Sequence, residues 1–199
     1  MKLFESSDLT EEPLIKVNEW ILEAVNLNVP LPHAMNLSTA DESGQPSSRM
    51  VLLKHISDKG LVFYTDYKSQ KGQTLDSNPK AALNFWWSKL DKQIRIEGIC
   101  TKTSKKESDD YFFSRPRGSQ VSATVSIQSK VIDTYEELLE RAKDLEKISN
   151  GDLPRPSRWG GYQLKPLRIE FWKNELNRLH KRELFFIENN QWQKKLLSP

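Results

Sequence analysis

The sequence predicts a mainly β protein of the α+β class, a small antiparallel β-barrel with helices packed outside it. Short apolar runs alternate with tight turns such as Ser57-Asp58-Lys59-Gly60, and consecutive strands joined in this way are typical of antiparallel sheets and barrels. The 199 residues contain no internal repeat, low-complexity tract or clear linker, so we expect one domain over residues 1–199. Residues 1–30 form its N-terminal helical segment, and residues 34–199 form the barrel and the packed helices.

The first half of the chain is expected to hold one helix and most of the strands. Thr10 is a candidate cap and Pro13 suits the first turn, and the helix must end before Pro30. Its apolar residues recur at helical spacing, at Leu14, Val17, Ile21 and Val25. Strands follow at residues 34–40, 47–55 and 61–66, a short helix at 69–75, and a probable hairpin at 81–87 and 93–101.

The second half is expected to be helical and then to return to strands. Helices are predicted at residues 105–113 and 135–148, the second with a core-facing stripe of Leu138, Leu139, Ala142 and Leu145. A loop at residues 151–156 separates them from strands at 162–164, 167–172 and 184–187.

Composition narrows the classes of function. Lysine and arginine (30) nearly balance the acids (27), so the net charge of +3 does not indicate nucleic-acid binding and favours a small anionic ligand. No run is apolar enough to span a membrane, and we expect a cytoplasmic protein. The single cysteine, Cys100, is expected to be a buried small hydrophobe. The spacing of histidine and cysteine matches no zinc motif, so no metal is expected.

The segment Arg178-Leu179-His180-Lys181-Arg182 lies between two apolar runs that are typical of strands. If it is extended too, alternation places Arg178, His180 and Arg182 on one face, where they could meet an anion or a planar ring. A solvated hairpin edge explains the same charges about as well.

Three further segments could hold an anion. The strand Arg49-Met50-Val51-Leu52-Leu53-Lys54 carries a cation at each end, although alternation puts the two on opposite faces. After Tyr64-Thr65, the run Ser69-Gln70-Lys71 opens a helix whose N–H groups can bind phosphate. For both segments, solvated strand ends or ordinary capping remain open alternatives.

The third segment is Ser114-Arg115-Pro116-Arg117-Gly118-Ser119-Gln120, which packs two guanidinium groups and two hydroxyls around a proline. Arginine makes forked bonds to phosphate oxygens, and Tyr111 lies one helical turn earlier. A surface turn is the alternative. The sequence has no nucleophile–base set and no dinucleotide turn, so a bound cofactor is expected to supply the chemistry.

In this order, these segments resemble the pyridoxine (pyridoxamine) 5′-phosphate oxidase family. The resemblance runs from about Ala34 to Pro199. It rests on these segments together with Gln93, Val125-Ser126-Ile127-Gln128-Ser129, Trp159-Gly160-Gly161, Glu170-Phe171-Trp172 and the C-terminal Leu197-Ser198-Pro199.

The resemblance implies an FMN-binding split β-barrel that forms a homodimer, with FMN at the subunit interface. The implied reaction is oxidation of pyridoxamine or pyridoxine 5′-phosphate to pyridoxal 5′-phosphate by O2, with release of H2O2. The residues implied to contact or border FMN are Arg49, Met50, Val51, Leu52, Leu53, Lys54, Tyr64, Thr65, Gln70, Lys71, Gln93, Gln128, Ser129, Trp172 and Arg182. Those implied to bind the substrate phosphate are Lys54, Tyr111, Arg115 and Ser119. Arg178 and His180 are implied to line the pyridine ring and to be catalytic.

The chain departs from the family pattern at three places. Gln70 stands where the family usually has arginine, Lys181 stands where it usually has aspartate, and no N-terminal Arg-x-x-Tyr motif is evident. Two alternatives therefore stay open: an FMN-dependent oxidase of another flat aromatic substrate, as in phenazine biosynthesis, and a non-catalytic flavin-binding protein.

Overall fold

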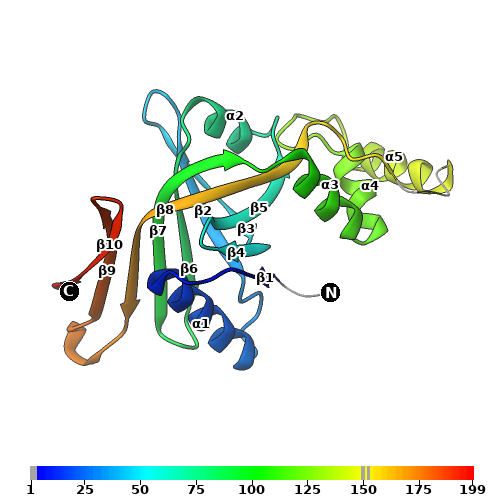
Figure 1. Ribbon diagram of the computed structural model, residues 1–199. Coiled ribbons are helices and arrows are strands. Elements are labelled where there is room, and N and C mark those ends of the chain that lie inside the picture. The colour runs from blue at the N-terminus through cyan, green and yellow to red at the C-terminus, as the bar shows by residue number, and fades with distance from the viewer. Residues whose placement is uncertain (1–3, 149–150, 152) are drawn as a thin grey trace.

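One curled sheet forms a half-barrel that dominates the molecule (Figure 1). The computed structural model describes residues 4–148, 151 and 153–199. In this part of the chain the sheet has ten strands: β1 Glu5–Ser6, β2 Ala34–Ala40, β3 Pro46–Leu52, β4 His55–Ser57, β5 Gly60–Asp66, β6 Lys80–Trp87, β7 Lys92–Lys102, β8 Trp159–Lys173, β9 Lys181–Glu188 and β10 Gln191–Leu197. The main path runs β1-β4-β5-β8-β7-β6-β2-β3, while β9 and β10 continue from β8.

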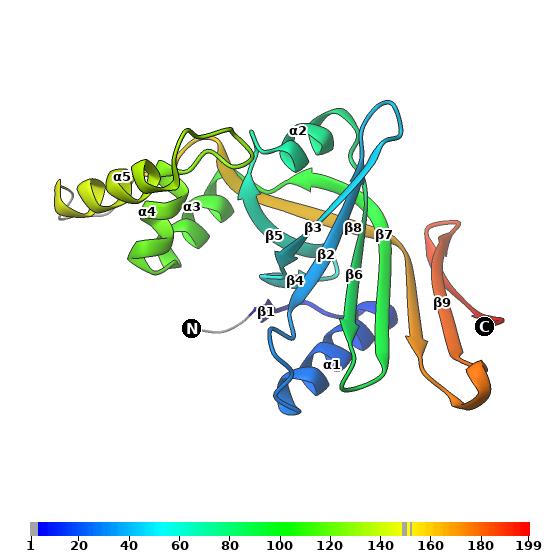
Figure 2. The same ribbon diagram turned by 180° about the vertical axis from the view of Figure 1, so that it is seen from behind.

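The helices lie outside the sheet, as predicted. They are α1 Glu12–Asn26, α2 Gln70–Ser77, α3 Lys105–Ser114, α4 Arg117–Val125 and α5 Tyr135–Ile148. The helices α3, α4 and α5 project as a lobe from one side, and β9 and β10 lie on the opposite side, in both ribbon views (Figures 1 and 2). The mainly β class and the helices packed outside the barrel are therefore confirmed.

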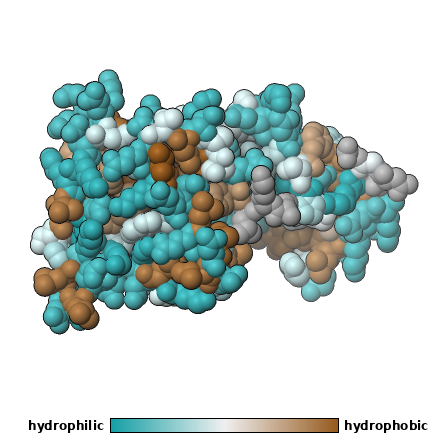
Figure 3. Space-filling model, turned by 60° about the horizontal axis from the view of Figure 1, so that its bottom comes forward, coloured by the Kyte–Doolittle hydropathy of each residue, from teal (hydrophilic) through white to brown (hydrophobic). Residues whose placement is uncertain are grey.

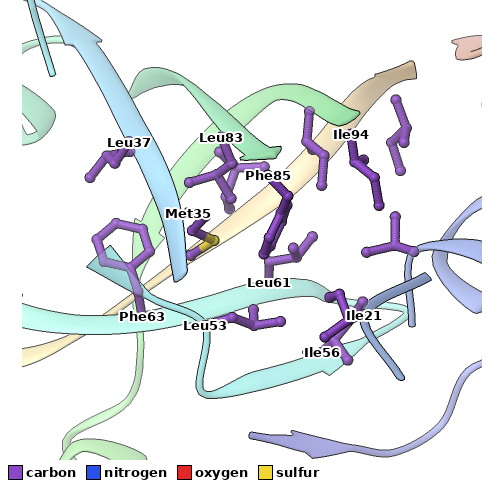
Figure 4. Close-up of a cluster of buried hydrophobic side chains, with 14 of the residues drawn as sticks. Ile21, Met35, Leu37, Leu53, Ile56, Leu61, Phe63, Leu83, Phe85 and Ile94 are labelled. Carbon is purple, nitrogen blue, oxygen red and sulfur yellow. The ribbon is translucent and has the colours of Figure 1, made fainter. Parts of the chain in front are cut away.

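The main core fills the hollow of the sheet, and α1 closes one end of it (Figure 4). Strand alternation supplies most of its side chains, because Met35 and Leu37 of β2 and Leu83 and Phe85 of β6 all point inward and are fully buried. Ile21 of α1 packs into the same cluster. A smaller cluster of Phe112, Val121, Leu153 and Trp159 joins α3 and α4 to β8.

Most predicted elements are confirmed, and the differences have local causes. The expected strand 47–55 is two strands, because the chain turns at Leu53-Lys54. The strands expected at 162–164 and 167–172 are one strand, β8, in which a register shift opposite Glu97 and Gly98 absorbs the irregularity. The segment Ser114–Gln120, for which a surface turn was the alternative, is largely helical, since α4 begins at Arg117. The strands β1 and β10 were not predicted.

The predicted apolar stripe is buried in α1 but not in α5. In α1, Leu14, Val17 and Ile21 are buried, but the fourth buried apolar residue of the stripe is Ala24, and Val25 is half-buried. In α5, no described residue is buried, and Leu139 is 42% exposed. Ala142 and Leu145 are partly buried and pack against the smaller cluster. Of the loop expected at 151–156, Asp152 lies outside the described residues.

The start of α1 is capped differently from the prediction. Glu11, not Thr10, is the N-cap residue, and its side chain makes no capping bond. The carboxylate of Asp58 accepts bonds from the backbone N–H groups of Thr10 and Glu11 instead. A residue 48 positions away in the chain therefore supplies the cap, which no local pattern could indicate.

The surface is mainly hydrophilic on the face shown in Figure 3, with hydrophobic side chains in separate patches. Within the described ranges, no helix is both long enough and apolar enough to cross a membrane.

An ion-pair network fixes α1 to the C-terminal strands. The Glu183 carboxylate lies 2.7 Å from the Lys16 ammonium of α1 and 3.1 Å from that of Lys194. Burial alone raises the pKa of this carboxyl, but the hydrogen bonds from Lys16 and Lys194 outweigh burial and lower the pKa to about 2.

We expect Glu183→Gln to lower the free energy of unfolding by about 2–3 kcal/mol at pH 7. Since the folded-state pKa lies below the unfolded value near 4.5, this contribution is complete above about pH 5 and declines as the pH falls toward 2. Urea denaturation of both proteins at several pH values measures it. A difference in stability that does not narrow between pH 5 and 3 would contradict the assignment.

Candidate functional site

The break between β3 and β4 sends Lys54 into a cavity of about 400 Å³. Leu53 is fully buried in the core, and its N–H donates to the carbonyl of His33. The Lys54 N–H donates to the carbonyl of Val62, which holds the turn against β5. The cavity is lined by Met50, Val51, Leu52, Lys54, Tyr64, Thr65, Lys71, Tyr111, Arg115, Pro116, Ser119, Gln128 and Trp159.

Two cations of this cavity lack a counterion. Neither Lys54 nor Arg115 belongs to an ion pair among the described residues. Burial lowers the pKa of Lys54, and the nearby Arg115 lowers it further; burial also lowers the pKa of Arg115. The Nη1 atom of Arg115 is buried and has no hydrogen-bond partner. A buried donor on a cation is costly unless it is paired, so this atom fits an anionic oxygen of a ligand.

Three aromatic rings form one wall of the cavity. Tyr64 and Tyr111 are stacked with 3.9 Å between ring centroids, and Trp159 is stacked on Tyr64 at 5.6 Å. The Arg115 guanidinium lies 4.5 Å from the centroid of Trp159, which orients it. Burial raises the pKa of both tyrosines, so their hydroxyls stay protonated and can donate hydrogen bonds.

A second group of polar side chains surrounds Lys71 in the first turn of α2. Ser69 caps this helix by accepting from the N–H of Gly72. The Lys71 ammonium lies 3.2 Å from Thr65 Oγ1 and 3.0 Å from Gln128 Oε1. Burial lowers the pKa of Lys71, and the charge of Arg49 lowers it further. With two cations and a helix N-terminus, this group can hold a second phosphate.

The remaining residues of this group lie outside the cavity. The Arg49 guanidinium donates hydrogen bonds to the Leu37 carbonyl and to the hydroxyls of Thr39 and Ser47. These bonds to β2 and β3 hold its side chain in place. Gln70 is exposed in α2, and Ser129 lies in the loop after α4 with a positive φ of 65°. None of the three lines the cavity.

The close packing of α2 depends on Gly72. A Cβ atom at this position would lie 2.2 Å from the carbonyl oxygen of Tyr67 and 2.5 Å from its carbon, and both are backbone atoms that cannot move aside. We expect Gly72→Ala to lower the free energy of unfolding by about 2–3 kcal/mol, as measured by denaturant titration. Gly118→Ala in α4 is the matched control, because its Cβ meets nothing within 4 Å and alanine favours helix. Equal stability of the two variants would contradict the packing argument.

The other predicted site residues gather at the far end of β8. Gln93 pairs with Trp172 across β7 and β8, and the Trp172 ring lies 4.6 Å from that of His180. Arg182 of β9 donates to the Glu170 carboxylate over 2.8 Å and to the Ser198 carbonyl. None of these residues lines the 400 Å³ cavity, and in both ribbon views this strand end lies across the sheet from α3 and α4 (Figures 1 and 2).

The condition that Arg178 to Arg182 is extended throughout is not met. Residues Leu176–Arg178 form a 3₁₀ turn, with positive φ at Asn177 (55°) and Arg178 (62°), and β9 begins only at Lys181. Strand alternation therefore does not place Arg178, His180 and Arg182 on one face. Arg178 is exposed on the turn, while His180 Nδ1 accepts from the N–H of Glu175 at 3.4 Å.

Sequence reasoning missed the roles of two side chains. Trp159 was recognised only as part of a motif, yet it forms the cavity wall and orients Arg115. Glu170 was recognised in the same way, yet it is 6% exposed and binds both Arg95 and Arg182. An acidic residue among apolar strand neighbours was the available signal, because a buried carboxylate requires a partner.

The half-barrel places the protein in the split-barrel class. Its aromatic-walled cavity contains unpaired cations and is suited to bind an anion. The family model described as pyridoxamine 5′-phosphate oxidase matches residues 21–148. The model described as the pyridoxine 5′-phosphate oxidase C-terminal dimerisation region matches residues 159–199. The chain belongs to the pyridoxamine 5′-phosphate oxidase family.

Relatives and solved structures agree with this family. The pyridoxine/pyridoxamine 5′-phosphate oxidase of Thermosynechococcus vestitus is 45% identical over 193 residues, which is 97% of this chain and 92% of the relative. That of Paraburkholderia xenovorans is 43% identical and covers 96% and 91%. The crystal structure of PhzG from Burkholderia lata, in complex with tetrahydrophenazine-1-carboxylic acid, superposes with a TM-score of 0.92 at 32% identity and covers 96% and 94%. An FMN-binding protein from Nostoc punctiforme has a TM-score of 0.78 at 15% identity, covering 96% of this chain and 100% of its own, which shows the shared fold.

Proposed function

We propose that the protein is a cytoplasmic, FMN-dependent oxidase that converts pyridoxamine 5′-phosphate and pyridoxine 5′-phosphate to pyridoxal 5′-phosphate. O2 is the acceptor, and H2O2 is released. The observation that carries the proposal is the buried, unpartnered Nη1 of Arg115 beside Lys54, because it fits a substrate phosphate. Relatives more than 40% identical over almost the whole chain carry the name of this activity.

The residues around Lys71 fit FMN. Lys71 and Arg49 supply the charge for its phosphate, and Thr65 and Gln128 supply hydrogen bonds. Met50, Val51 and Leu52 present the edge of β3 beside them, with Gln70 and Ser129 nearby in the chain. When bound, FMN supplies the hydride acceptor of the reaction.

The substrate residues divide between phosphate and ring. Lys54 and Arg115 bind the phosphate by charge, and the hydroxyls of Tyr111 and Ser119 donate hydrogen bonds to it. Arg178 lies flat on the pyridine ring, and His180 hydrogen-bonds its polar edge; both thereby hold the reacting carbon in place.

The protein acts as a single-domain homodimer with FMN at the interface. Within one chain, none of Gln93, Trp172, Arg178, His180 and Arg182 lines the cavity of Lys54 and Arg115. The far end of β8 lies on the side of the molecule opposite to α3 and α4 (Figures 1 and 2). A second copy can bring its strand end to the cavity of the first, and the match of residues 159–199 to a dimerisation region supports this arrangement.

An oxidase of a flat, unphosphorylated substrate is the second candidate, because the similar PhzG structure binds tetrahydrophenazine-1-carboxylic acid. The pair Lys54 and Arg115 favours the phosphorylated substrate.

One spectroscopic experiment tests cofactor, substrate and reaction together. Purified protein loaded with FMN is mixed anaerobically with pyridoxamine 5′-phosphate, and the flavin absorbance near 450 nm is followed. We expect bleaching with this substrate and with pyridoxine 5′-phosphate, and much slower bleaching with pyridoxine. Unchanged absorbance with every B6 phosphate would indicate a non-catalytic flavin-binding protein. Equal rates with and without the phosphate would favour the second candidate.

A further inference from the structure

A separate group of lysines lies at the end of the sheet that α1 covers. It surrounds a cavity of about 240 Å³ between α1 and the strands β7, β8 and β9. Lys16 and Trp20 come from α1, and Lys92, Phe171, Lys173 and Lys181 come from the strands. We refer to it as the lysine cavity. It shares no residue with the 400 Å³ cavity.

Three of these lysines form a row across the sheet. Lys92 of β7 pairs with Lys173 of β8, and Lys173 pairs with Lys181 of β9, so neighbouring positions all carry positive charge. Like charges directly opposite one another destabilise a sheet. The row is therefore costly unless a negative charge lies between the ammonium groups.

The carboxylates of the chain compensate this charge only in part. Among the described residues, Glu183 is the one acidic residue that lines the cavity, and Lys16, Lys181 and Lys194 all pair with it. Lys92 reaches Glu23, and Lys173 reaches Glu175, a surface pair in which both side chains are nearly half exposed. Such an exposed pair contributes little. Lys194 lies outside the cavity and also pairs with Glu12 at 3.6 Å. The four lysines of the cavity and the three carboxylates Glu183, Glu23 and Glu175 therefore leave a surplus of about one positive charge.

Two of the lysines are held against aromatic rings rather than free in solvent. The Lys16 and Lys92 side chains are 22% and 13% exposed. The Lys16 ammonium lies 4.7 Å from the centroid of Phe171, and that of Lys92 lies 4.6 Å from the centroid of Trp20. A solvated strand edge would not bury its ammonium groups in this way. The rings give the cavity a fixed floor, and Lys173 and Lys181 form its open rim.

We propose that the lysine cavity binds a phosphate group, as inorganic phosphate or as a small phosphate monoester. The surplus of positive charge and the row of adjacent lysines favour an anion, and ammonium groups bind phosphate as point charges. A cavity of about 240 Å³ exceeds the size of a phosphate ion, so a small organic part can rest on Trp20 and Phe171. The bound group removes the repulsion along the lysine row and ties α1 to β8 and β9.

Isothermal titration of the FMN-loaded protein with inorganic phosphate tests the proposal, because bound FMN occupies the phosphate-binding group around Lys71. The Arg115→Ala background removes phosphate binding in the 400 Å³ cavity, so that the remaining heat reports the lysine cavity. In this background, Lys173→Ala should weaken binding about tenfold. Lys195→Ala should leave it unchanged, since Lys195 of β10 removes the same charge outside the lysine cavity. Phenyl phosphate replaces inorganic phosphate in a second series, and tighter binding there would identify a monoester.

Thermal unfolding separates a ligand site from a structural ion pair. Without phosphate, Lys173→Ala should be as stable as the parent or more stable, because one repulsive charge is gone. With saturating phosphate, the parent should gain in Tm and the variant should gain less. No phosphate binding in the Arg115→Ala background would overturn the proposal. So would a Lys173→Ala isotherm equal to that of Lys195→Ala.

Discussion

Replacement of Arg115 by alanine should reduce kcat/KM for pyridoxamine 5′-phosphate by about 10²-fold to 10³-fold. Arg115 is half-buried, its buried Nη1 atom has no partner, and its guanidinium lies against Trp159, so it is positioned for one anionic ligand. Loss of one partner of a buried, hydrogen-bonded charge pair costs about 2–5 kcal/mol, which corresponds to this range. Steady-state measurement of H2O2 release gives the value.

Two controls make the result specific. Arg117→Ala removes a guanidinium two residues away, at the start of α4 and outside the cavity lining, and should change kcat/KM less than threefold. With unphosphorylated pyridoxine, the Arg115→Ala protein and the parent should react at nearly equal, slow rates. A fall of the same size for pyridoxine would show that the substitution damages the site as a whole and not phosphate binding.

The residues of the cavity could be predicted because their chemistry is local. Arg115, Ser119 and Tyr111 lie within nine residues of one another, and any helix or loop at this position keeps them close. The helical form of α4 could not be predicted from Arg-Gly-Ser-Gln-Val-Ser-Ala-Thr-Val, since glycine, serine, threonine and valine are weak helix formers. Contact of α4 with α3 and β8 through Val121 stabilises it instead.

The conformation of the segment from Arg178 to Arg182, in contrast, could not be predicted from the sequence. Alternation predicts one face only if every residue is extended, and a single residue with positive φ ends that register. Asparagine tolerates the left-handed region, so Asn177 permits the turn without requiring it. Arg178 follows with positive φ as well, which is uncommon for a long side chain and which no sequence pattern indicates.

The location of Arg178, His180 and Arg182 relative to the cavity also could not be predicted from the sequence of one chain. The chain places Lys54 and Arg115 at one region of the sheet and the end of β8 at another, and in the proposed homodimer a second copy joins them. The proposed homodimer thus makes a strong prediction about subunits: each complete site takes Arg115 from one chain and Arg178 from its partner.

A heterodimer of one Arg115→Ala subunit and one Arg178→Ala subunit should regain about half of the parent activity, although each variant homodimer is almost inactive. One of its two sites carries both substitutions, and the other carries neither. Arg178 is exposed, so its replacement removes no buried contact, and Arg115→Ala removes the contact with Trp159 at the cavity wall. Co-expression with two different affinity tags and tandem purification isolates the heterodimer for measurement of kcat.

The matched control places both substitutions on one subunit and pairs it with an unmodified subunit. This heterodimer carries the same two changes, yet each of its sites lacks one arginine, so its activity should stay at the level of the variant homodimers. If the two arrangements gave the reverse result, with activity only when both substitutions share a chain, Arg115 and Arg178 would serve the same site from one subunit. That outcome would require the strand end of β8 to approach α3 and α4 within a single chain, whereas both ribbon views show them on opposite sides of the molecule (Figures 1 and 2).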